Sequence, residues 1–345
     1  MTKREASDLV EAKELQRRLA FPAKSRVLHL LWSGAMSGIP VGTAGASHLD
    51  EVVIPNVQGK EFVKKVRFSP PIISGSISDD RRTTLHGDIM YVKPESNKLP
   101  FLVMTSDFGL TTVRSLESRG RITIGRAIDD TLNLYKRHDW KIMAVHSDME
   151  SGILEGLESI VGPPHMPTGA GSHDGRVDER IRRIKDNMRS LQAGLPYKLG
   201  DALTIWCTYY ACYVLNLLPA RSGDGLSPRE IFTGLKPDYK RVLPVAFGTF
   251  CQVKEKTTNT LATRSVTAIA LLPTGHGPVK FTSLYTGRVI TRLQFRPVQT
   301  IPHEYILILN SMQERKCIGI EDLLNPDTCV NYESPSRWVM RLSRT

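Results

Sequence analysis

The sequence predicts a mixed α/β core followed by a small β-rich domain, and three observations indicate this architecture. Three consecutive strand-like segments begin at Leu85, and a helical segment and a fourth apolar strand follow them. Three strands, a helix and a fourth strand form a compact α/β pattern. Two long helical segments come next, and short strands separated by turn residues follow Pro219.

The N-terminal region differs from this core. Residues 3–20 have the charged and apolar alternation of an amphipathic surface helix. From Phe21 to Thr84, glycine, proline and serine interrupt the apolar residues repeatedly, so we expect irregular structure with only short helices.

The core itself is predicted from five segments that occur in order. The three strands and the buried fourth strand have apolar runs of strand length, whereas the segment between them has apolar residues at helical spacing. A loop rich in glycine and proline then precedes the long helices. In order, the segments are HGDIMYV, LPFLVMTSD, GLTTVRSL, the helical ITIGRAIDDTLNLYKRH, the strand WKIMAVHSD and the loop VGPPHMPTGAGSHDG.

The helix GRVDERIRRIKDNMRS places acids and cations in an unusual order. An apolar stripe recurs at helical spacing, and Asp178 begins a neighbouring flank on which Arg182, Lys185 and Arg189 follow. One interpretation is ordinary helix chemistry, because acids favour a helix N-terminus and Glu179 can pair with Arg183. The other is that one acid binds a metal while the cations hold a polyanion. The stripe consists of Val177, Ile181, Ile184, Met188 and Leu191.

The last part of the chain is β-rich. Four segments read as short strands, and the tail after Ile301 is mixed, with a helix expected in HEYILILNSMQERK. We therefore divide the chain into an N-terminal helix with an irregular segment (1–84), the α/β core (85–220), a closing segment with the small β-rich domain (221–300) and a tail (301–345). The four strands are FGTFCQVKE, SVTAIALLP, VKFTSLYTG and RVITRLQFRP.

Composition limits the class of protein. Lys and Arg number 46 against 35 Asp and Glu, a net charge of +11. Such an excess favours a polyanionic partner, nucleic acid rather than membrane, although a basic protein without such a partner is an alternative. The five cysteines include no CxxC pair, which favours a reducing, intracellular compartment over a disulfide framework. No signal peptide or membrane-spanning segment is expected, so we predict a protein that is not secreted.

Three acidic positions lie where an α/β sheet gathers functional side chains. Asp88 is near the start of the first strand, Asp148 follows the fourth, and Asp178 or Glu179 opens a helix. Converging carboxylates repel one another unless cations neutralise them, and Mg²⁺ suits a site of a few carboxylates with substrate phosphate. Two such ions, roughly 3.5–4 Å apart, can promote phosphoryl transfer. The alternative is that each acid is a turn or cap residue.

From about Trp32 to Pro302 the sequence resembles the integrase region of copia-type LTR-retrotransposon polyproteins, within the retroviral integrase and DDE transposase superfamily. The first region resembles the pre-integrase segment, and the next three resemble the acidic blocks in their order. The fifth resembles the segment that closes the core, and the sixth resembles the β-rich part after it. These regions are WSGAMSGIPV with PNVQGKEFVKKV, HGDIMYV, VHSDMESGI, DGRVDERIRRIKDNMRS with GLPYKL, DGLSPREIFTGLKPDYKRVLPVAFGTFCQV and TAIALLPTGHGPVKFTSLYTGRVITRLQFRPV.

The resemblance implies an RNase H-like core and 3′-end processing and strand transfer that depend on Mg²⁺ or Mn²⁺. Carried over by position, Asp88 and Asp148 are metal ligands. The third ligand has two alignments: IRRIK places it on Asp178, the assignment we favour, whereas a literal E-R match places it on Glu179, followed by Arg180. Asp178 is shorter than the family's usual Glu, a departure that bears on activity.

The resemblance also implies partners. These are element-end DNA, target DNA and further copies of the chain in a homo-oligomer. The resemblance also implies a location in the nucleus or in a cytoplasmic particle, and a chain that is a fragment of a longer polyprotein. Two other functions stay open: a decayed or repurposed integrase that only binds DNA, and a metal-dependent nuclease of the same fold. The candidate DNA contacts are Arg180, Arg182, Arg183, Lys185 and Arg189, for which a solvated charged face is the alternative.

Overall fold

The computed structural model describes residues 2–50, 55, 81–93, 98–147, 153, 162–167, 175–219, 225–255, 264–298 and 300–314. Three helices open the chain: α1 (Lys3–Arg18), α2 (Lys24–Ser33) and α3 (Thr43–Ala46). The predicted N-terminal helix is confirmed. The Thr2 hydroxyl accepts the Glu5 N–H and the Glu5 carboxylate accepts the Thr2 N–H, so a capping box fixes where α1 begins.

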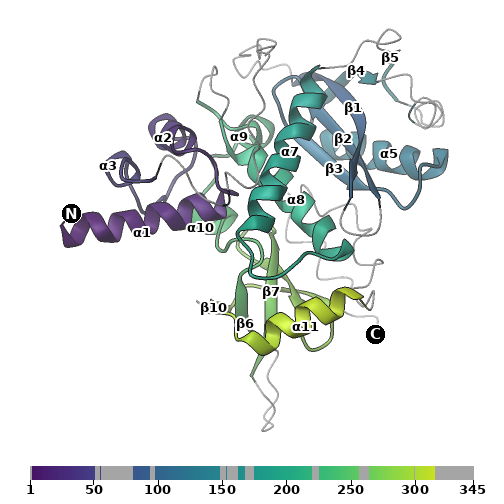
Figure 1. Ribbon diagram of the computed structural model, residues 1–345. Coiled ribbons are helices and arrows are strands. Elements are labelled where there is room, and N and C mark those ends of the chain that lie inside the picture. The colour runs from purple at the N-terminus through teal and green to yellow at the C-terminus, as the bar shows by residue number, and fades with distance from the viewer. Residues whose placement is uncertain are drawn as a thin grey trace.

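The first sheet has the mixed topology of an RNase H-like core (Figure 1). Its strand order is β3-β2-β1-β4-β5, with β1–β2 and β2–β3 antiparallel and β1–β4 and β4–β5 parallel. The predicted mixed α/β class is confirmed. The helix α5 (Arg121–Arg137) connects β3 to β4. The strands are β1 (Arg82–Val92), β2 (Leu99–Ser106), β3 (Thr111–Ser115), β4 (Lys141–Ser147) and β5 (His165–Pro167).

Strand β5 lies within the segment that we predicted to be entirely loop. It contains only three residues, His165 to Pro167, and it pairs with the end of β4. A strand this short and adjacent to prolines has no alternation to detect, so only its pairing with β4 reveals it.

The helices α7 (Gly175–Ala193) and α8 (Asp201–Leu217) lie against this sheet (Figure 1). The apolar stripe predicted for α7 faces the core, with Val177, Ile184 and Met188 buried. From Leu203 to Leu217 every residue of α8 is buried. One side of α8 contacts β3, where Asn216 Oδ1 accepts the Thr111 N–H at 2.9 Å, and another side contacts the second sheet.

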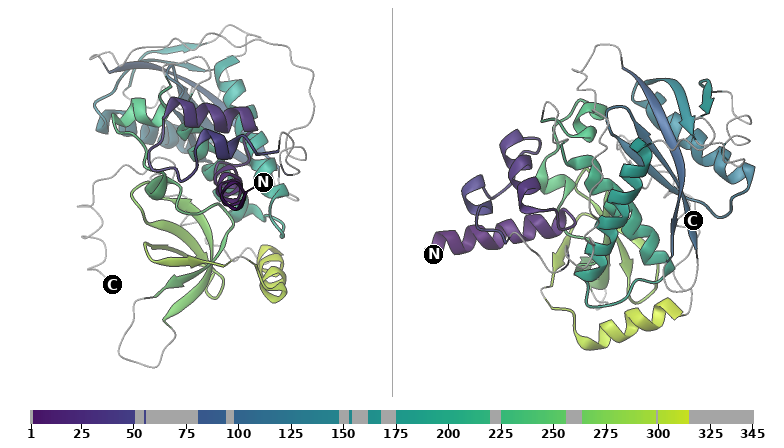
Figure 2. Two further views of the ribbon diagram at one scale, coloured as in Figure 1. Left: turned by 90° about the vertical axis from the view of Figure 1, so that its left-hand side faces the viewer. Right: turned by 45° about the horizontal axis from the view of Figure 1, so that its top comes forward.

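The second sheet is antiparallel and has the order β10-β6-β7-β8-β9 (Figure 2). The segment that we predicted as one final strand forms two strands, because Leu293 and Gln294 interrupt the extended backbone. The short helices α9 (Pro228–Thr233) and α10 (Tyr239–Val242) precede this sheet, and α11 (His303–Glu314) follows it. Its strands are β6 (Phe250–Lys254), β7 (Ser265–Pro273), β8 (Val279–Ser283), β9 (Val289–Arg292) and β10 (Phe295–Pro297).

The second sheet belongs partly to the main core. Residues such as Phe250, Ile269 and Leu271 join the same buried cluster as α8, whereas Val253, Ala270 and Phe281 belong to a small separate core. In the described part of the chain, no helix is both long and apolar enough to cross a bilayer.

Candidate functional site

Asp88 lies in the middle of β1 on the face of the sheet that α7 covers. Side chains alternate along a strand, so Asp88 points to the same face as His86, which Arg176 of α7 approaches. Asp88 is half-buried, and its Oδ1 accepts the Ile89 N–H at 2.6 Å. Burial and the charge of Arg189 lower the pKa of Lys185, whereas the charge of Asp88 opposes this shift. The carboxylate of Asp88 is therefore close to the cations of α7.

The second expected ligand, Asp148, lies outside the described residues. Strand β4 ends one residue earlier, at Ser147, which pairs with Gly87 of β1. The two strands run parallel, and His86 pairs with His146 one position earlier, their rings stacked 5.1 Å apart. The described pairing of β1 with β4 therefore ends at the residues directly before Asp88 and Asp148.

Asp178 and Glu179 lie on different sides of α7. Asp178 is exposed and is seven residues, or nearly two turns, before Lys185, so the two share a flank. Glu179 is half-buried and forms an ion pair with Arg183 on another flank. Of the two acids, Asp178 therefore shares the flank whose Lys185 lies near Asp88.

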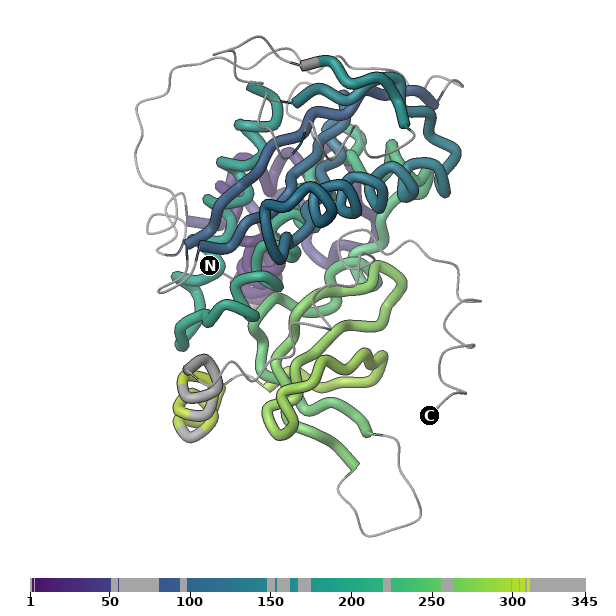
Figure 3. Tube along the Cα trace, turned by 90° about the vertical axis from the view of Figure 1, so that its right-hand side faces the viewer, coloured from purple at the N-terminus to yellow at the C-terminus, as the bar shows by residue number. Residues whose placement is uncertain are grey.

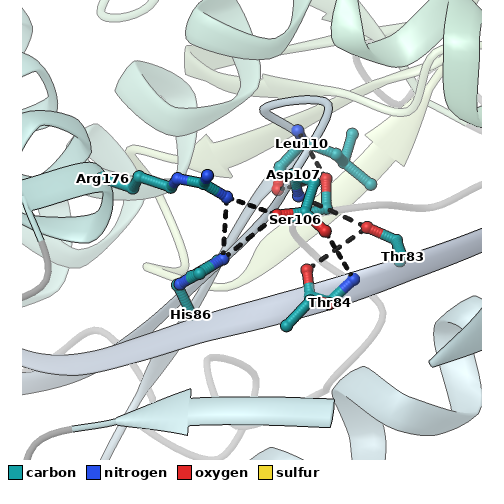
Figure 4. A network of polar contacts seen from close by, with 7 residues as sticks. All are labelled: Thr83, Thr84, His86, Ser106, Asp107, Leu110 and Arg176. Carbon is teal, nitrogen blue, oxygen red and sulfur yellow. Dashed lines mark hydrogen bonds and ion pairs between the residues drawn. The ribbon is translucent and has the colours of Figure 1, made fainter. Parts of the chain in front are cut away.

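A polar network joins the first turn of α7 to the sheet (Figure 4). Asp107, just after β2, forms an ion pair with Arg176 and lies 3.2 Å from Nε2 of His86. Its Oδ2 accepts the Thr84 N–H at 2.8 Å, and its own N–H donates to Thr83 Oγ1 at 3.3 Å. Because Arg176 is two residues before Asp178, this network holds the part of α7 that carries the candidate third ligand.

Sequence reasoning missed Asp107 and Arg176. Each is unremarkable locally: one follows a strand and the other begins a helix. Burial alone would raise the pKa of Asp107, but the hydrogen bonds from His86 and Thr84 and the charges of His86 and Arg176 together lower it to about 2.

We expect Asp107→Asn to destabilise the protein at pH 7 by about 1 kcal/mol. The shift from 3.8 to about 2 corresponds to roughly 2 kcal/mol, which we halve because 35% of the side chain is exposed to solvent screening. A lowered carboxyl pKa stabilises the folded state above the unfolded pKa, and this contribution disappears as the pH falls from about 4 toward 2. Urea unfolding at pH 7 and pH 3 measures both effects.

The matched control for this change is Asp129→Asn on the exposed face of α5. Wild type and control should lose the same stability between pH 7 and pH 3, and Asp107→Asn should lose less. An identical pH dependence in all three proteins contradicts the role assigned to Asp107.

The five predicted DNA contacts are not equivalent. Arg182 and Arg189 are exposed and Lys185 is half-buried on the predicted flank, whereas Arg183 pairs with Glu179. Arg180 is buried, with 8% of its surface exposed, and is the least accessible of the five. Burial and then the charge of Arg183 lower its pKa to about 10.

Arg180 is buried because Gly109 makes room for it. The backbone at Gly109 has a φ of +88°, and a Cβ added there would lie 2.4 Å from Nη2 of Arg180. The guanidinium therefore packs on the loop between β2 and β3. Helical spacing places Arg180 beside the apolar stripe, three residues after Val177 and four before Ile184, but it does not show which loop the side chain contacts.

The described residues do not complete a metal site by themselves. Within the described ranges, no three His, Cys, Asp or Glu side chains are placed to hold a metal ion together. Asp88 and Asp178 are the two expected ligands within these ranges, and Asp178 shares the flank of α7 that carries Lys185. Asp148 lies outside these ranges.

No protein-family model matches the sequence, and no curated protein matches it. Among solved structures, the chain is similar to the HTLV-2 integrase catalytic core domain in complex with magnesium, in a trimeric form (18% identity, TM-score 0.35) and a dimeric form (18%, 0.34), each match covering 44% of this chain and 96% of that one. It is also similar to the simian T-cell lymphotropic virus intasome in complex with the PP2A regulatory subunit B56 gamma (11%, 0.36), with 81% and 100% covered. The RNase H-like assignment follows from the strand order and directions described above.

Proposed function

We propose that this chain is an integrase-type polynucleotidyl transferase that processes 3′ ends of element DNA and joins them to a target. One observation carries the proposal: Asp88 lies under the basic helix α7, in a strand whose pairing with β4 ends at Gly87 and Ser147. The residues that follow these two in the sequence are Asp88 and Asp148. In the reaction, a 3′-hydroxyl attacks a target phosphodiester and the leaving 3′-oxygen departs, without a covalent protein intermediate.

Asp88, Asp148 and Asp178 would hold the metal in this proposal. Hard oxygen donors of this kind suit Mg²⁺ or Mn²⁺, and the half-buried carboxylate of Asp88 fits a ligand position. When bound, such ions activate an attacking oxygen and stabilise a leaving oxygen in phosphoryl transfer. Arg176, through Asp107 and His86, orients the helix turn that presents Asp178.

The exposed flank of α7 would hold the nucleic acid. Arg182, Lys185 and Arg189 face one way, and cations in such a row contact successive phosphates without reading the sequence. Binding should therefore weaken with salt. Arg183 pairs with Glu179 and is a weaker candidate.

The finer identity follows the sequence blocks described earlier. We propose that the chain derives from a copia-type LTR retrotransposon, that it is part of a longer polyprotein, and that it acts as a homo-oligomer in the nucleus or in a cytoplasmic particle. A second candidate function is a DNA-binding protein without catalysis. Asp178 favours it, because this exposed Asp is one methylene shorter than the Glu usual in the family, and metal sites tolerate such shifts poorly.

One assay separates these functions. Purified protein is incubated with Mg²⁺ or Mn²⁺, labelled element-end DNA and a target plasmid, and the products are resolved on gels. Joined products support the integrase. Nicked plasmid without joining indicates a nuclease, and salt-sensitive binding with neither product indicates the protein without catalysis. The absence of binding and of both products contradicts all three.

We expect Asp178→Asn to reduce joining by about 10²-fold or more, because the asparagine amide lacks the negative charge of the carboxylate and binds a divalent cation much more weakly. Glu179→Gln is the matched control, because the Glu179 carboxylate pairs with Arg183 on another flank of α7. Joining by this variant should change less than about threefold, as expected for a side chain outside the site. The strand-joining assay compares both variants with wild type. Loss of joining only in Glu179→Gln shows that the third ligand is Glu179.

A further inference from the structure

A pocket opens between the end of β1, the second half of α7 and the start of α8, elements that adjoin one another in Figures 1 and 3. Its volume is about 480 Å³. The polar residues of its wall come from all three regions, and the lining includes Tyr91, Lys93, Lys185, Arg189, Gln192 and Lys198.

The wall of this pocket is strongly basic. Four cations line it, and none of the described lining residues is Asp or Glu. Arg189 pairs with Asp186 at 3.0 Å, an acid outside the lining. Lys93 and Lys198 are exposed, so their ammonium groups can follow a ligand. Cations gathered from three separate elements favour a ligand with more than one negative charge.

The pocket adjoins the candidate site at Lys185 and Val92. Lys185 lines the pocket and interacts with the charge of Asp88, and Val92, which also lines it, lies four residues after Asp88 in β1 and so points to the same face of the sheet. A ligand that fills the pocket would therefore extend toward the acid.

The size of the pocket limits its ligand. Its 480 Å³ falls within the range of about 300–1,000 Å³ typical of small-molecule sites. This space accepts one or two nucleotides. A DNA duplex, whose major groove alone is about 12 Å wide, does not enter it.

We propose that this pocket binds the sugar-phosphate backbone of one or two unpaired nucleotides, which extend a nucleic-acid strand whose reacting phosphodiester lies beside Asp88. The inference rests on the proposed function, and it adds a preference for strands with unpaired ends. Lys93 and Lys198 belong to the pocket but not to the flank that carries Arg182, so they can be changed separately.

The experiment uses Lys93→Gln, Lys198→Gln and the double variant, with Lys240→Gln on α10 as a matched exposed control. Fluorescence anisotropy measures binding of a labelled tetrathymidylate and of a labelled blunt duplex between 50 and 200 mM salt. Each pocket change should weaken single-strand binding roughly five- to tenfold at the lowest salt and reduce the slope of log K against log salt by about 0.7. Duplex binding and the control should change less than twofold.

Four outcomes overturn the inference. Equal weakening of duplex and single strand shows that the lysines act as general surface charge. Displacement of the oligonucleotide from wild type by tripolyphosphate at equal or lower concentration shows that the pocket takes a free polyphosphate. Wild type that binds duplex but not the single strand refutes this inference alone, whereas wild type that binds neither refutes the proposed function as well.

Discussion

Replacing Asp88 by Asn is expected to reduce strand joining by on the order of 10³-fold or more while DNA binding stays within about twofold of wild type. Asparagine has nearly the same shape, and its carbonyl oxygen can still accept the Ile89 N–H that Asp88 accepts at 2.6 Å. The fold should therefore persist, whereas the negative charge that a divalent cation requires is lost. The cations of α7 are unchanged, so binding to phosphates should continue.

The gel-based joining assay and anisotropy binding are measured on the same preparations of wild type, Asp88→Asn and Asp129→Asn. Asp129 lies on the exposed face of α5, so its variant should behave as wild type in both. Joining by Asp88→Asn within a few-fold of wild type would show that this aspartate is not a metal ligand.

The second large effect is on stability. Trp206→Ala should lower the free energy of unfolding by about 3–5 kcal/mol, because it removes a large side chain from a close-packed interior. Trp206 is fully buried in α8, its ring contacts Tyr209 edge-on at 5.8 Å, and Nζ of Lys280 in β8 lies 5.5 Å from its centre. The resulting cavity would therefore lie beside Tyr209 of α8 and Lys280 of the second sheet.

Urea unfolding followed by circular dichroism tests this effect against Trp32→Ala. Trp32, at the end of α2, is 74% exposed, and its removal should change stability by less than about 0.5 kcal/mol. Equal losses in the two variants would contradict the central position of α8.

Local pattern predicted the parts of the fold that have a regular period. The apolar runs of strand length after Leu85 and the helical spacing from Val177 to Leu191 indicate strands and a helix whatever surrounds them. The mixed α/β class follows from the order of such segments. By contrast, β5 and the break between β9 and β10 involve so few residues that periodicity has nothing to repeat.

The site was predicted less completely, because contacts between distant residues leave no local pattern. Asp107 and Arg176 are 69 residues apart, and only the folded sheet and helix bring them together. Arg180 lies beside the apolar stripe of α7, but only the fold shows that a glycine 71 positions earlier gives its guanidinium space in the interior. The flank with Arg182 and Lys185 depends only on helix geometry and lies where it was expected.

The burial of α8 on every side has a consequence for how this chain can change over generations. From Leu203 onward the helix has no solvent-facing surface, since one sheet packs on one side and the second sheet on another. If recombination replaced either sheet with one that does not fit α8, the apolar surface of α8 would be exposed to solvent, which favours aggregation. Each sheet must therefore keep the surface that fits α8, whereas the surfaces that point away from α8 are not under this constraint.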